Sequence, residues 1–304
     1  MTPIGDGPFP SAREDAELAD RNEEHPQTRS AAYRLAFKDV DFLLREDLRP
    51  VRLQLELLKP ELLLKEQGIR STIVVFGSAR IHDRETAEAN LTAAESAARA
   101  DPGNHDLANR VGVARRMLAN TRYYEEARRL AQIVSSACAA PAECDFVVLT
   151  GGGPGIMEAA NRGADDMNAK SIGLNIVLPH EQAPNSYVTP ELSFQFHYFA
   201  LRKMHFLNRA KALVIFPGGY GTLDEMFEAA TLVQTGKIDP IPFLLFGKEY
   251  WERVINFETM ASEGMIDPAD KHIFQFVETA EEAWHHIARF WGIPPLQPAK
   301  ISAD

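Results

Sequence analysis

The sequence predicts an α/β protein with a doubly wound parallel sheet, in a single domain that carries a helical N-terminal extension and a helical insertion. Three observations predict this fold. Short runs rich in β-branched residues recur along the chain, as in strands that are buried on both faces. Several of these runs end in glycine, and a helical segment follows the turn. The repeated order of strand, turn and helix in one sense is typical of a parallel sheet.

The chain divides into segments of different composition. Its first residues hold Pro, Gly and many charges but almost no large apolar side chain, which is typical of a flexible arm. In the next segment apolar residues recur at helical spacing, and Pro50 and Pro60 interrupt them, so we expect two or three short helices. The expected segments are a flexible arm (1–30), a helical extension (31–70), a Rossmann-like domain (71–292) with a helical insertion (about 82–120), and a tail (293–304).

The elements of the Rossmann-like domain follow from the apolar runs and the turns between them. The expected strands are Thr72–Phe76, Phe146–Thr150, Ile172–Val177, Ser193–His197, Ala212–Phe216 and Ile241–Phe246. Helices are expected at Tyr123–Ala139, Ile156–Asn168, Phe199–Ala210, from the glycine turn after Phe216 to about Thr235, and at Ala280–Phe290.

Composition and charge disfavour several classes of protein. The 304 residues are 45% hydrophobic and 25% charged, as in globular proteins. Acidic residues exceed basic ones by 43 to 32, which gives a formal net charge of −11. That balance disfavours nucleic acid and anionic membranes as partners, because both attract basic surfaces. No apolar stretch approaches the roughly 18 residues of a membrane span, and the N-terminus lacks the features of a signal peptide.

Cysteine and histidine usage gives two further expectations. Cys138 and Cys144 are too few for a disulfide framework or a four-thiolate metal site, so a cytoplasmic protein is expected. The histidines are scattered along the chain, and no cluster of histidine, cysteine and carboxylate residues has the spacing of metal ligands. We therefore expect no metal.

Three glycine turns follow strands, at the edge where ligands bind in such sheets. Glycine lets the backbone approach a phosphate, and the following helix offers free N–H groups. The alternative is that the glycines only close tight turns. From the three turns together we expect a phosphate and ribose site built from Gly77, Ser78, Gly152, Gly153, Gly155, Gly218, Gly219, Gly221 and Thr222.

The glycine spacing disfavours two common nucleotide sites. Ile156 stands where a dinucleotide fingerprint needs its third glycine, and no acidic ribose ligand follows at the right distance. The Gly–Lys pairs at Gly236 and Gly247 lack the other residues of a P-loop. A nucleoside monophosphate fits better than NAD, FAD or a nucleoside triphosphate, and no cofactor is expected.

The segment PGGYGTLDE, from Pro217 to Glu225, is the most specific motif. Its glycines can form an anion-binding nest, and we expect Thr222 to be both the helix N-cap and a phosphate donor. An acidic residue in a first helical turn can simply complement the helix dipole, which suffices for Asp224. For Glu225 we favour a functional role, because a second negative charge beside a phosphate would otherwise repel it.

Arg202 and Lys203 lie on a helix whose other residues are mostly apolar. A lone basic pair more often lies on a solvated face. On a largely buried helix a guanidinium needs an anionic partner, and helix, strand and turn return the chain from Arg202 toward Glu225. We expect Arg202 in the site and Lys203 among the groups that bind phosphate or ribose.

The sequence resembles the LOG family in three of these motifs. They are TGGGPGIMEAANRGA from Thr150, the Arg–Lys pair, and PGGYGTLDEMFE from Pro217. The members of this family are cytokinin-activating phosphoribohydrolases and bacterial relatives, long mislabelled as lysine decarboxylases. The resemblance implies that Arg202 and Glu225 are the catalytic residues. It also implies a homodimer or larger homo-oligomer with sites near the subunit interface.

The sequence departs from the plant members in its N-terminal extension, its insertion and the residues Tyr198 to Leu201 before the Arg–Lys pair. The longer bacterial members are more similar and act on AMP or other nucleotides. The expected reaction is hydrolysis of the N-glycosidic bond of AMP or a cytokinin riboside 5′-monophosphate to free base and ribose 5-phosphate. Two alternatives remain: a non-catalytic carrier of a nucleotide or molybdenum cofactor, and a pyridoxal-phosphate lysine decarboxylase in which Lys203 forms the Schiff base.

The expected reaction needs a negative charge beside the ribose carbon whose bond to the base breaks. The ribose becomes oxocarbenium-like in glycosidic cleavage, so a carboxylate at Glu225 can stabilise it and orient or deprotonate the attacking water. Arg202 can anchor the ligand, and we expect it to hold Glu225 ionised by lowering its pKa.

Overall fold

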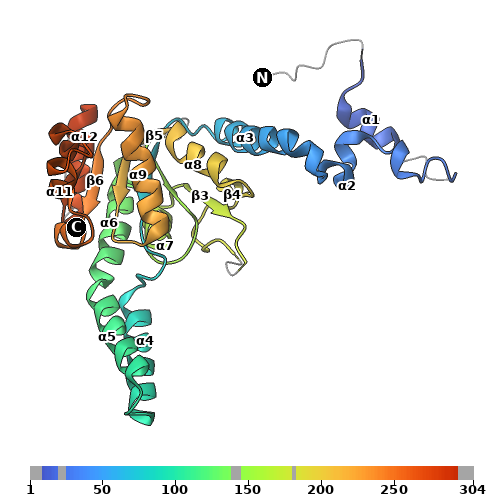
Figure 1. Ribbon diagram of the computed structural model, residues 1–304. Coiled ribbons are helices and arrows are strands. Elements are labelled where there is room, and N and C mark those ends of the chain that lie inside the picture. Colours follow the sequence, from blue (N-terminus) through green and yellow to red (C-terminus); the bar gives the residue numbers. More distant parts are fainter. Residues whose placement is uncertain (1–8, 20–24, 138–144, 180–182, 294–304) are drawn as a thin grey trace, which may run out of the picture. The chain divides into compact units, whose positions relative to one another are not determined.

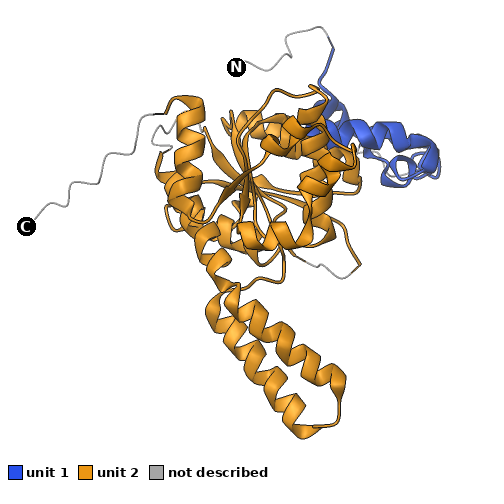
Figure 2. Ribbon diagram, turned by 60° about the vertical axis from the view of Figure 1, so that its left-hand side comes forward, with its two compact units in different colours: residues 1–59 blue, residues 60–304 orange. Residues whose placement is uncertain are grey.

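The computed structural model describes the chain except residues 1–8, 20–24, 138–144, 180–182 and 294–304 (Figure 1). Parts of the expected arm and tail, with Cys138 and Cys144, lie outside the described residues. The chain forms two compact units, Met1–Lys59 and Pro60–Asp304 (Figure 2), and each is described by itself.

Unit 1 consists of short helices and the first part of a longer one. The α-helices are α1 (Ala12–Ala19), α2 (Val40–Leu43) and α3 (Arg49–Glu66), and single 3-10 turns cover Ala31–Tyr33, Ala36–Lys38 and Glu46–Leu48. Asp39 caps α2 through a hydrogen bond from the Phe42 N–H.

The expected break at Pro60 is wrong, because α3 continues through it. Pro50 lies in the first turn, where its missing N–H costs nothing. An interior proline costs roughly 3 kcal/mol, but Pro60 and Leu64 are buried, and Leu64 packs in the core of unit 2. Burial of this end of the helix offsets the lost hydrogen bond.

Unit 2 contains a seven-stranded sheet whose neighbouring strands are all parallel, in the order β4-β3-β2-β1-β5-β6-β7. The strands are β1 (Thr72–Phe76), β2 (Val147–Thr150), β3 (Ser171–Ile176), β4 (Ser193–Phe196), β5 (Ala210–Ile215), β6 (Phe243–Phe246) and β7 (Gln275–Val277). The doubly wound parallel sheet is therefore confirmed.

Helices cover both faces of the sheet. The helices of unit 2 after α3 are α4 (Arg84–Ala100), α5 (His105–Ala119), α6 (Thr121–Ala137), α7 (Ile156–Asp165), α8 (Phe199–Asn208), α9 (Tyr220–Gln234), α10 (Lys248–Val254), α11 (Phe257–Ser262) and α12 (Ala280–Trp291). Helices α6, α7 and α12 pack on one apolar face, and α8, α9 and α10 pack on the other. The helices α4 and α5 lie side by side and project from the rest of the unit (Figures 1 and 2).

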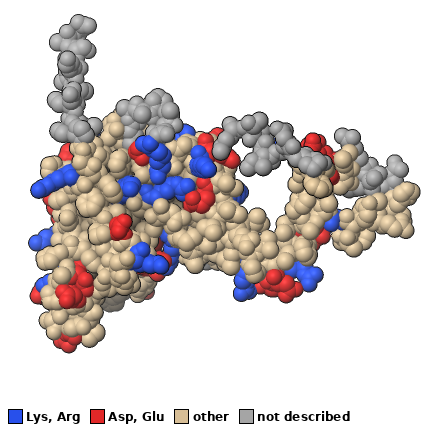
Figure 3. Space-filling view, turned by 90° about the horizontal axis from the view of Figure 1, so that it is seen from above, with Lys and Arg blue, Asp and Glu red and all other residues tan. Residues whose placement is uncertain are grey.

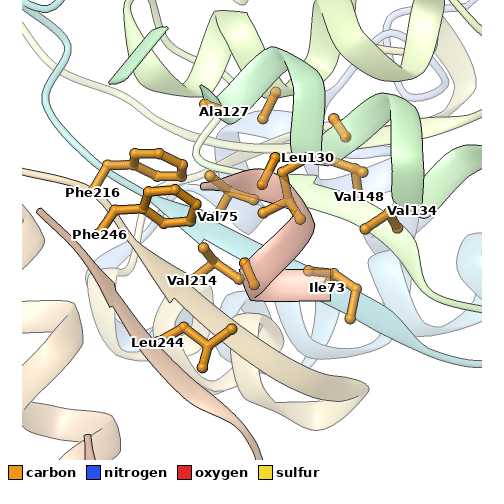
Figure 4. Close-up of a cluster of buried hydrophobic side chains, with 14 of the residues drawn as sticks. Ile73, Val75, Ala127, Leu130, Val134, Val148, Val214, Phe216, Leu244 and Phe246 are labelled. Atoms are coloured by element: carbon orange, nitrogen blue, oxygen red, sulfur yellow. The ribbon is translucent and has the colours of Figure 1, made fainter. Parts of the chain in front are cut away.

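The core explains why the strands are apolar throughout. Every residue of β1 is buried, because helices cover it on both sides. On one face, side chains of α6 such as Leu130 lie against the strands (Figure 4). At the end of this cluster Phe216 and Phe246 stack with ring centroids 4.1 Å apart. These two rings follow β5 and end β6, so packing fixes the positions where the ligand-facing loops begin.

The strand order reverses between β1 and β5, and this reversal positions the site. In open parallel sheets the crevice at such a switch point, outside the carboxyl ends of the strands, is the usual ligand site. The pairing continues past the strand ends, because Phe216 N–H donates to Phe76 O (2.9 Å) and Ser78 N–H donates to Pro217 O (3.0 Å). The loops after the two strands are thus held side by side.

On the face shown in Figure 3, basic and acidic side chains stand next to one another. Within the described part of the chain, no helix has the length and hydropathy needed to cross a membrane.

Candidate active site

A cleft with a volume of about 690 Å³ opens at the switch point between β1 and β5. It brings together residues from all three glycine turns and from helices α8 and α9. The expected site residues that line it are Gly77, Ser78, Gly153, Arg202, Gly218, Gly219, Gly221, Thr222 and Glu225. Three expected residues, Gly152, Gly155 and Lys203, do not line it.

The turn after β5 presents backbone amides to the cleft. Helix α9 begins at Tyr220 with Gly219 as its N-cap, so the expectation that Thr222 is the N-cap is wrong. The reason is geometric: the chain is already helical at Tyr220, which leaves Thr222 in the first turn, buried beneath Gly218. No side chain caps the helix, and the first N–H groups of a helix have no intrahelical acceptor.

Tyr250 of α10, which also lines the cleft, holds this turn in place. Its hydroxyl donates a 2.6 Å hydrogen bond to Gly218 O. Burial raises the pKa of Tyr250, so the hydroxyl keeps its proton and remains a donor. This hydrogen bond satisfies the Gly218 carbonyl and ties the turn after β5 to α10.

The loop after β1 is clamped between the other two turns. Ser78 N–H donates to Pro217 O, and Ser78 O accepts a 3.1 Å hydrogen bond from Ile156 N–H, the first residue of α7. Gly155 has φ +72°, and a Cβ there would lie 2.5 Å from Ser78 O. Gly155 therefore serves the site by letting two loops approach each other, outside the cleft itself.

The turn after β2 is fixed by an amide network behind the cleft. Gly152 N–H donates to Thr150 Oγ1 (2.9 Å), and Asn185 Nδ2 donates to the carbonyl oxygens of Gly152 and Gly153. Thr150 Oγ1 in turn donates to Asn161 Oδ1 (2.8 Å). Both glycines belong to this network, and of the two Gly153 lines the cleft.

Arg202 is buried in the wall of the cleft with 9% of its surface exposed. Its Nε donates to the carbonyl of Leu174 in β3 (2.7 Å), and its guanidinium carbon lies 5.0 Å from the centre of the Phe206 ring. Its Nη1 lies 3.4 Å from Oε1 of Glu225. The expected pair thus forms, from α8 and the first turns of α9.

Burial raises the pKa of Glu225 to about 7. The charge of Arg202 acts in the opposite direction, and Asp224 and Glu228 add to the rise. The expectation that Arg202 lowers the pKa of Glu225 is therefore wrong in its net result, because removal of the carboxylate from water outweighs one ion pair. A carboxyl group that titrates near neutral pH is suited to proton transfer.

Lys203 points away from the cleft into a separate ion network. Its Nζ lies 2.8 Å from Asp224 and 3.1 Å from Glu228, both on α9. Burial acts to lower the pKa of Lys203, but these two carboxylates outweigh it and raise that pKa. The network ties α8 to α9 and so supports the neighbouring Arg202–Glu225 pair.

Several cleft residues have no motif in the sequence that identifies them. Arg80 and Ile81 follow the glycine turn after β1, and Met117 and Asn120 come from the end of the helical insertion. The cleft also has apolar lining residues from several elements: Met157, Ile176, Leu178 and Phe199. Among the residues that the structure describes, no three His, Cys, Asp or Glu side chains are grouped as a metal site requires.

A family model and several curated proteins match parts of this chain. A family model described as "Possible lysine decarboxylase" matches residues 157–287. Cytokinin riboside 5′-monophosphate phosphoribohydrolase LOG1 of Arabidopsis thaliana is 34% identical over 82 residues, which cover 27% of this chain and 38% of LOG1. LOG3 of the same plant is 28% identical over 139 residues, which cover 45% of this chain and 63% of LOG3. The resemblance to the LOG family is confirmed.

The matches to LOG1 and LOG3 span less than two thirds of those proteins' own length. The segment matched by the family model includes Arg202 and the turn from Pro217 to Glu225, but it begins after Gly155. The match to this family model therefore includes the Arg202–Glu225 pair and the turn after β5.

Two solved structures are also similar. The molybdenum cofactor binding protein of Rippkaea orientalis is 19% identical, with a TM-score of 0.40, and covers 56% of this chain and 88% of that one. The Moco carrier protein of Chlamydomonas reinhardtii is 17% identical, with a TM-score of 0.41, and covers 73% of this chain and 98% of that one.

Proposed function

We propose that this protein hydrolyses the N-glycosidic bond of a nucleoside 5′-monophosphate and releases the free base and ribose 5-phosphate. The observation that carries the proposal is the buried Arg202–Glu225 pair, which opens into the same cleft as three backbone turns able to bind phosphate. The LOG relatives, whose names describe this reaction on cytokinin riboside 5′-monophosphates, support it.

The phosphate binds at the turn after β5. Gly219, Gly221 and the first turn of α9 supply N–H groups, and the dipole of this 15-residue helix favours an anion at its N-terminus. Because Glu225 lies within the first two turns of the same helix, a phosphate at its N-terminus sets the attached ribose beside the carboxyl group.

The chemistry uses the ionised form of Glu225. As the bond to the base breaks, positive charge develops on the ribose, and a carboxylate beside the anomeric carbon stabilises it. The same carboxylate accepts a proton from the attacking water, and a pKa near 7 suits that transfer. The base leaves with the electron pair of the broken C–N bond and takes up a proton, which balances the proton that water loses. Arg202, anchored on Leu174 O, keeps the carboxylate oriented toward the cleft.

The apolar lining of the cleft receives the base. Met157, Ile176, Leu178 and Phe199 offer stacking and van der Waals contact without a hydrogen-bonding side chain. Apolar surface of this kind discriminates weakly between bases and accepts an N6-alkyl group. The names of the LOG relatives point to cytokinin riboside 5′-monophosphates, so we propose AMP and its N6-isopentenyl derivative as substrates, both of which this surface can accept.

The residues present do not fit a pyridoxal-phosphate lysine decarboxylase, which the name of the matching family model suggests. Such an enzyme needs a lysine whose amine loses its proton readily to form a Schiff base. Lys203 pairs with two carboxylates, has a raised pKa and does not line the cleft.

Incubation of the purified protein with AMP tests the proposal, with free adenine and ribose 5-phosphate measured by chromatography. Stoichiometric release of both products over many turnovers is expected, and a panel that includes N6-isopentenyl-AMP and the other nucleoside monophosphates then gives the base preference. Tight nucleotide binding with no release of base would contradict the proposed reaction and favour the carrier alternative.

A further inference from the structure

A phosphate in this cleft needs positive charge around it. At neutral pH the 5′-phosphate of a nucleotide carries close to two negative charges. The cationic side chain expected for it from the sequence, Lys203, is committed to Asp224 and Glu228. Arg202 is committed to Leu174 O and Glu225. Backbone amides alone would have to balance the phosphate, unless another cation faces the cleft.

Arg80 is such a cation. It lines the cleft beside Ser78 and the turn after β5, and its side chain is exposed to solvent. Within the described residues its guanidinium forms no ion pair, in contrast to Arg202 and Lys203. The nearest acidic residue in sequence, Asp83, is engaged elsewhere, because it caps α4 by accepting from Thr86 N–H and Thr86 Oγ1.

The backbone that carries Arg80 is fixed in place. Arg80 N–H donates to Ser78 Oγ (3.1 Å), so the residue belongs to the loop clamped between Pro217 and Ile156. Gly77 shows how tight this packing is, since a Cβ there would lie 2.6 Å from Ile156. Because hydrogen bonds hold the backbone of this loop, Arg80 can bind a ligand in the cleft with less loss of backbone entropy than a residue on a mobile segment.

We propose that Arg80 is a binding residue for the 5′-phosphate, opposite the amides of Gly219 to Thr222. Its guanidinium donates charge-assisted, bidentate hydrogen bonds to two phosphate oxygens, which backbone amides from one turn do not replace. It thereby makes the enzyme specific for nucleotides over nucleosides. This inference rests on the proposed function and adds a residue from the loop after β1 to its site.

The experiment compares Arg80→Gln and Arg80→Lys with wild type, and Arg84→Gln is the matched control. Arg84 begins α4, pairs with Glu88 and does not line the cleft, so its substitution removes the same charge four residues away. The measurements are KM and kcat for AMP, the Kd for ribose 5-phosphate by calorimetry, and the melting temperature of each variant.

Arg80→Gln is expected to raise KM for AMP and Kd for ribose 5-phosphate by about 10- to 100-fold, the effect of losing hydrogen bonds to a charged group. Its kcat should stay within about threefold of wild type, because the phosphate is bound equally in ground and transition states. Arg80→Lys should recover part of the affinity, since it keeps the charge but loses the bidentate geometry. Arg84→Gln should behave as wild type.

Unchanged affinities in Arg80→Gln would overturn the inference, as would an equal loss in Arg84→Gln. If wild type binds ribose 5-phosphate in an Arg80-dependent way but releases no base from AMP, the inference holds and the proposed reaction fails. If wild type binds neither AMP nor ribose 5-phosphate, both fail.

Discussion

Arg202 Nη1 and Glu225 Oε1 lie 3.4 Å apart although 23 residues separate them in the chain. The pair is asymmetric. Arg202 is held more tightly by the carbonyl of Leu174, at 2.7 Å, than by the carboxylate. The arginine is therefore anchored on the sheet through Leu174. The glutamate is the partner whose charge can change during a reaction.

Glu225→Gln tests the catalytic role of the carboxylate. Without a negative charge beside the ribose, kcat for AMP should fall by about 10²- to 10³-fold, the usual cost of one lost transition-state contact. KM should change little, since the phosphate contacts remain. The matched control is Glu228→Gln on the same helix, which loses a contact to Lys203 but lies outside the cleft. Equal turnover in Glu225→Gln and wild type would contradict the assignment.

The pH profile follows from the raised pKa of Glu225. If the carboxylate is the active form, kcat/KM for AMP should rise with pH through about 7 and level off above it. The substrate's own second phosphate ionisation, near pH 6, is separated by repeating the profile on the residual activity of Glu225→Gln. In Glu225→Gln the rise of kcat/KM near pH 7 should be absent. A profile that falls above 7 would instead make Glu225 a general acid.

Folding stability should depend on the same group. The pKa of Glu225 is higher in the folded protein than its ordinary value of 4.5, so the fold favours the protonated form. Below about pH 4.5 the carboxyl group is protonated in both the folded and the unfolded protein. Between that pH and about 7 it ionises in the unfolded protein first, so the free energy of unfolding falls as the pH rises, and above about 7 the loss is constant. Glu225→Gln should therefore raise the free energy of unfolding at pH 8 by up to about 3 kcal/mol. Denaturant unfolding at pH 5 and pH 8 measures this, and an equal effect at both would contradict it.

The main features of the fold could be predicted because buried parallel strands have an unmistakable composition. The apolar run Thr72–Phe76 and the glycine turn after it gave the right strand, with the same bounds. By contrast, β7 has three residues, Gln275–Val277, too few to form a recognisable pattern. The break expected at Pro60 did not occur, because burial in the core outweighs a local preference, and the sequence alone does not display burial.

The candidate site could likewise be predicted only in part. Glycine motifs indicated which turns meet, and the Arg202–Glu225 pair formed as expected. The partner of Lys203 could not be predicted, because Asp224 and Glu228 reach it only once α8 and α9 pack together. The pKa of Glu225 depends on how much water surrounds it, which is a property of the assembled cleft.

A glycine in this turn can be needed either by the fold or by the ligand, and Gly218 and Gly219 differ in this respect. A Cβ on Gly218 would overlap the side chain of Thr222, whereas one on Gly219 would meet no protein atom within 4 Å. Gly219 has φ −96° and ψ −150°, an extended conformation at the edge of the β region and outside the left-handed region that favours glycine, so we expect the fold to tolerate alanine there. A ligand phosphate on the N–H groups of this turn would require it, because a methyl group would occupy the approach.

Gly219→Ala should therefore keep the melting temperature of wild type and raise KM for AMP by about tenfold or more, from weakened hydrogen bonds to the phosphate. Gly103→Ala is the control, since its Cβ also meets nothing within 4 Å and the residue lies in the turn between α4 and α5, away from the cleft. Thermal unfolding and steady-state kinetics of the two variants show whether Gly219 is needed by the fold or by the phosphate. Normal kinetics in Gly219→Ala would mean that the phosphate does not approach this amide, and a lowered melting temperature would mean that the glycine serves the fold.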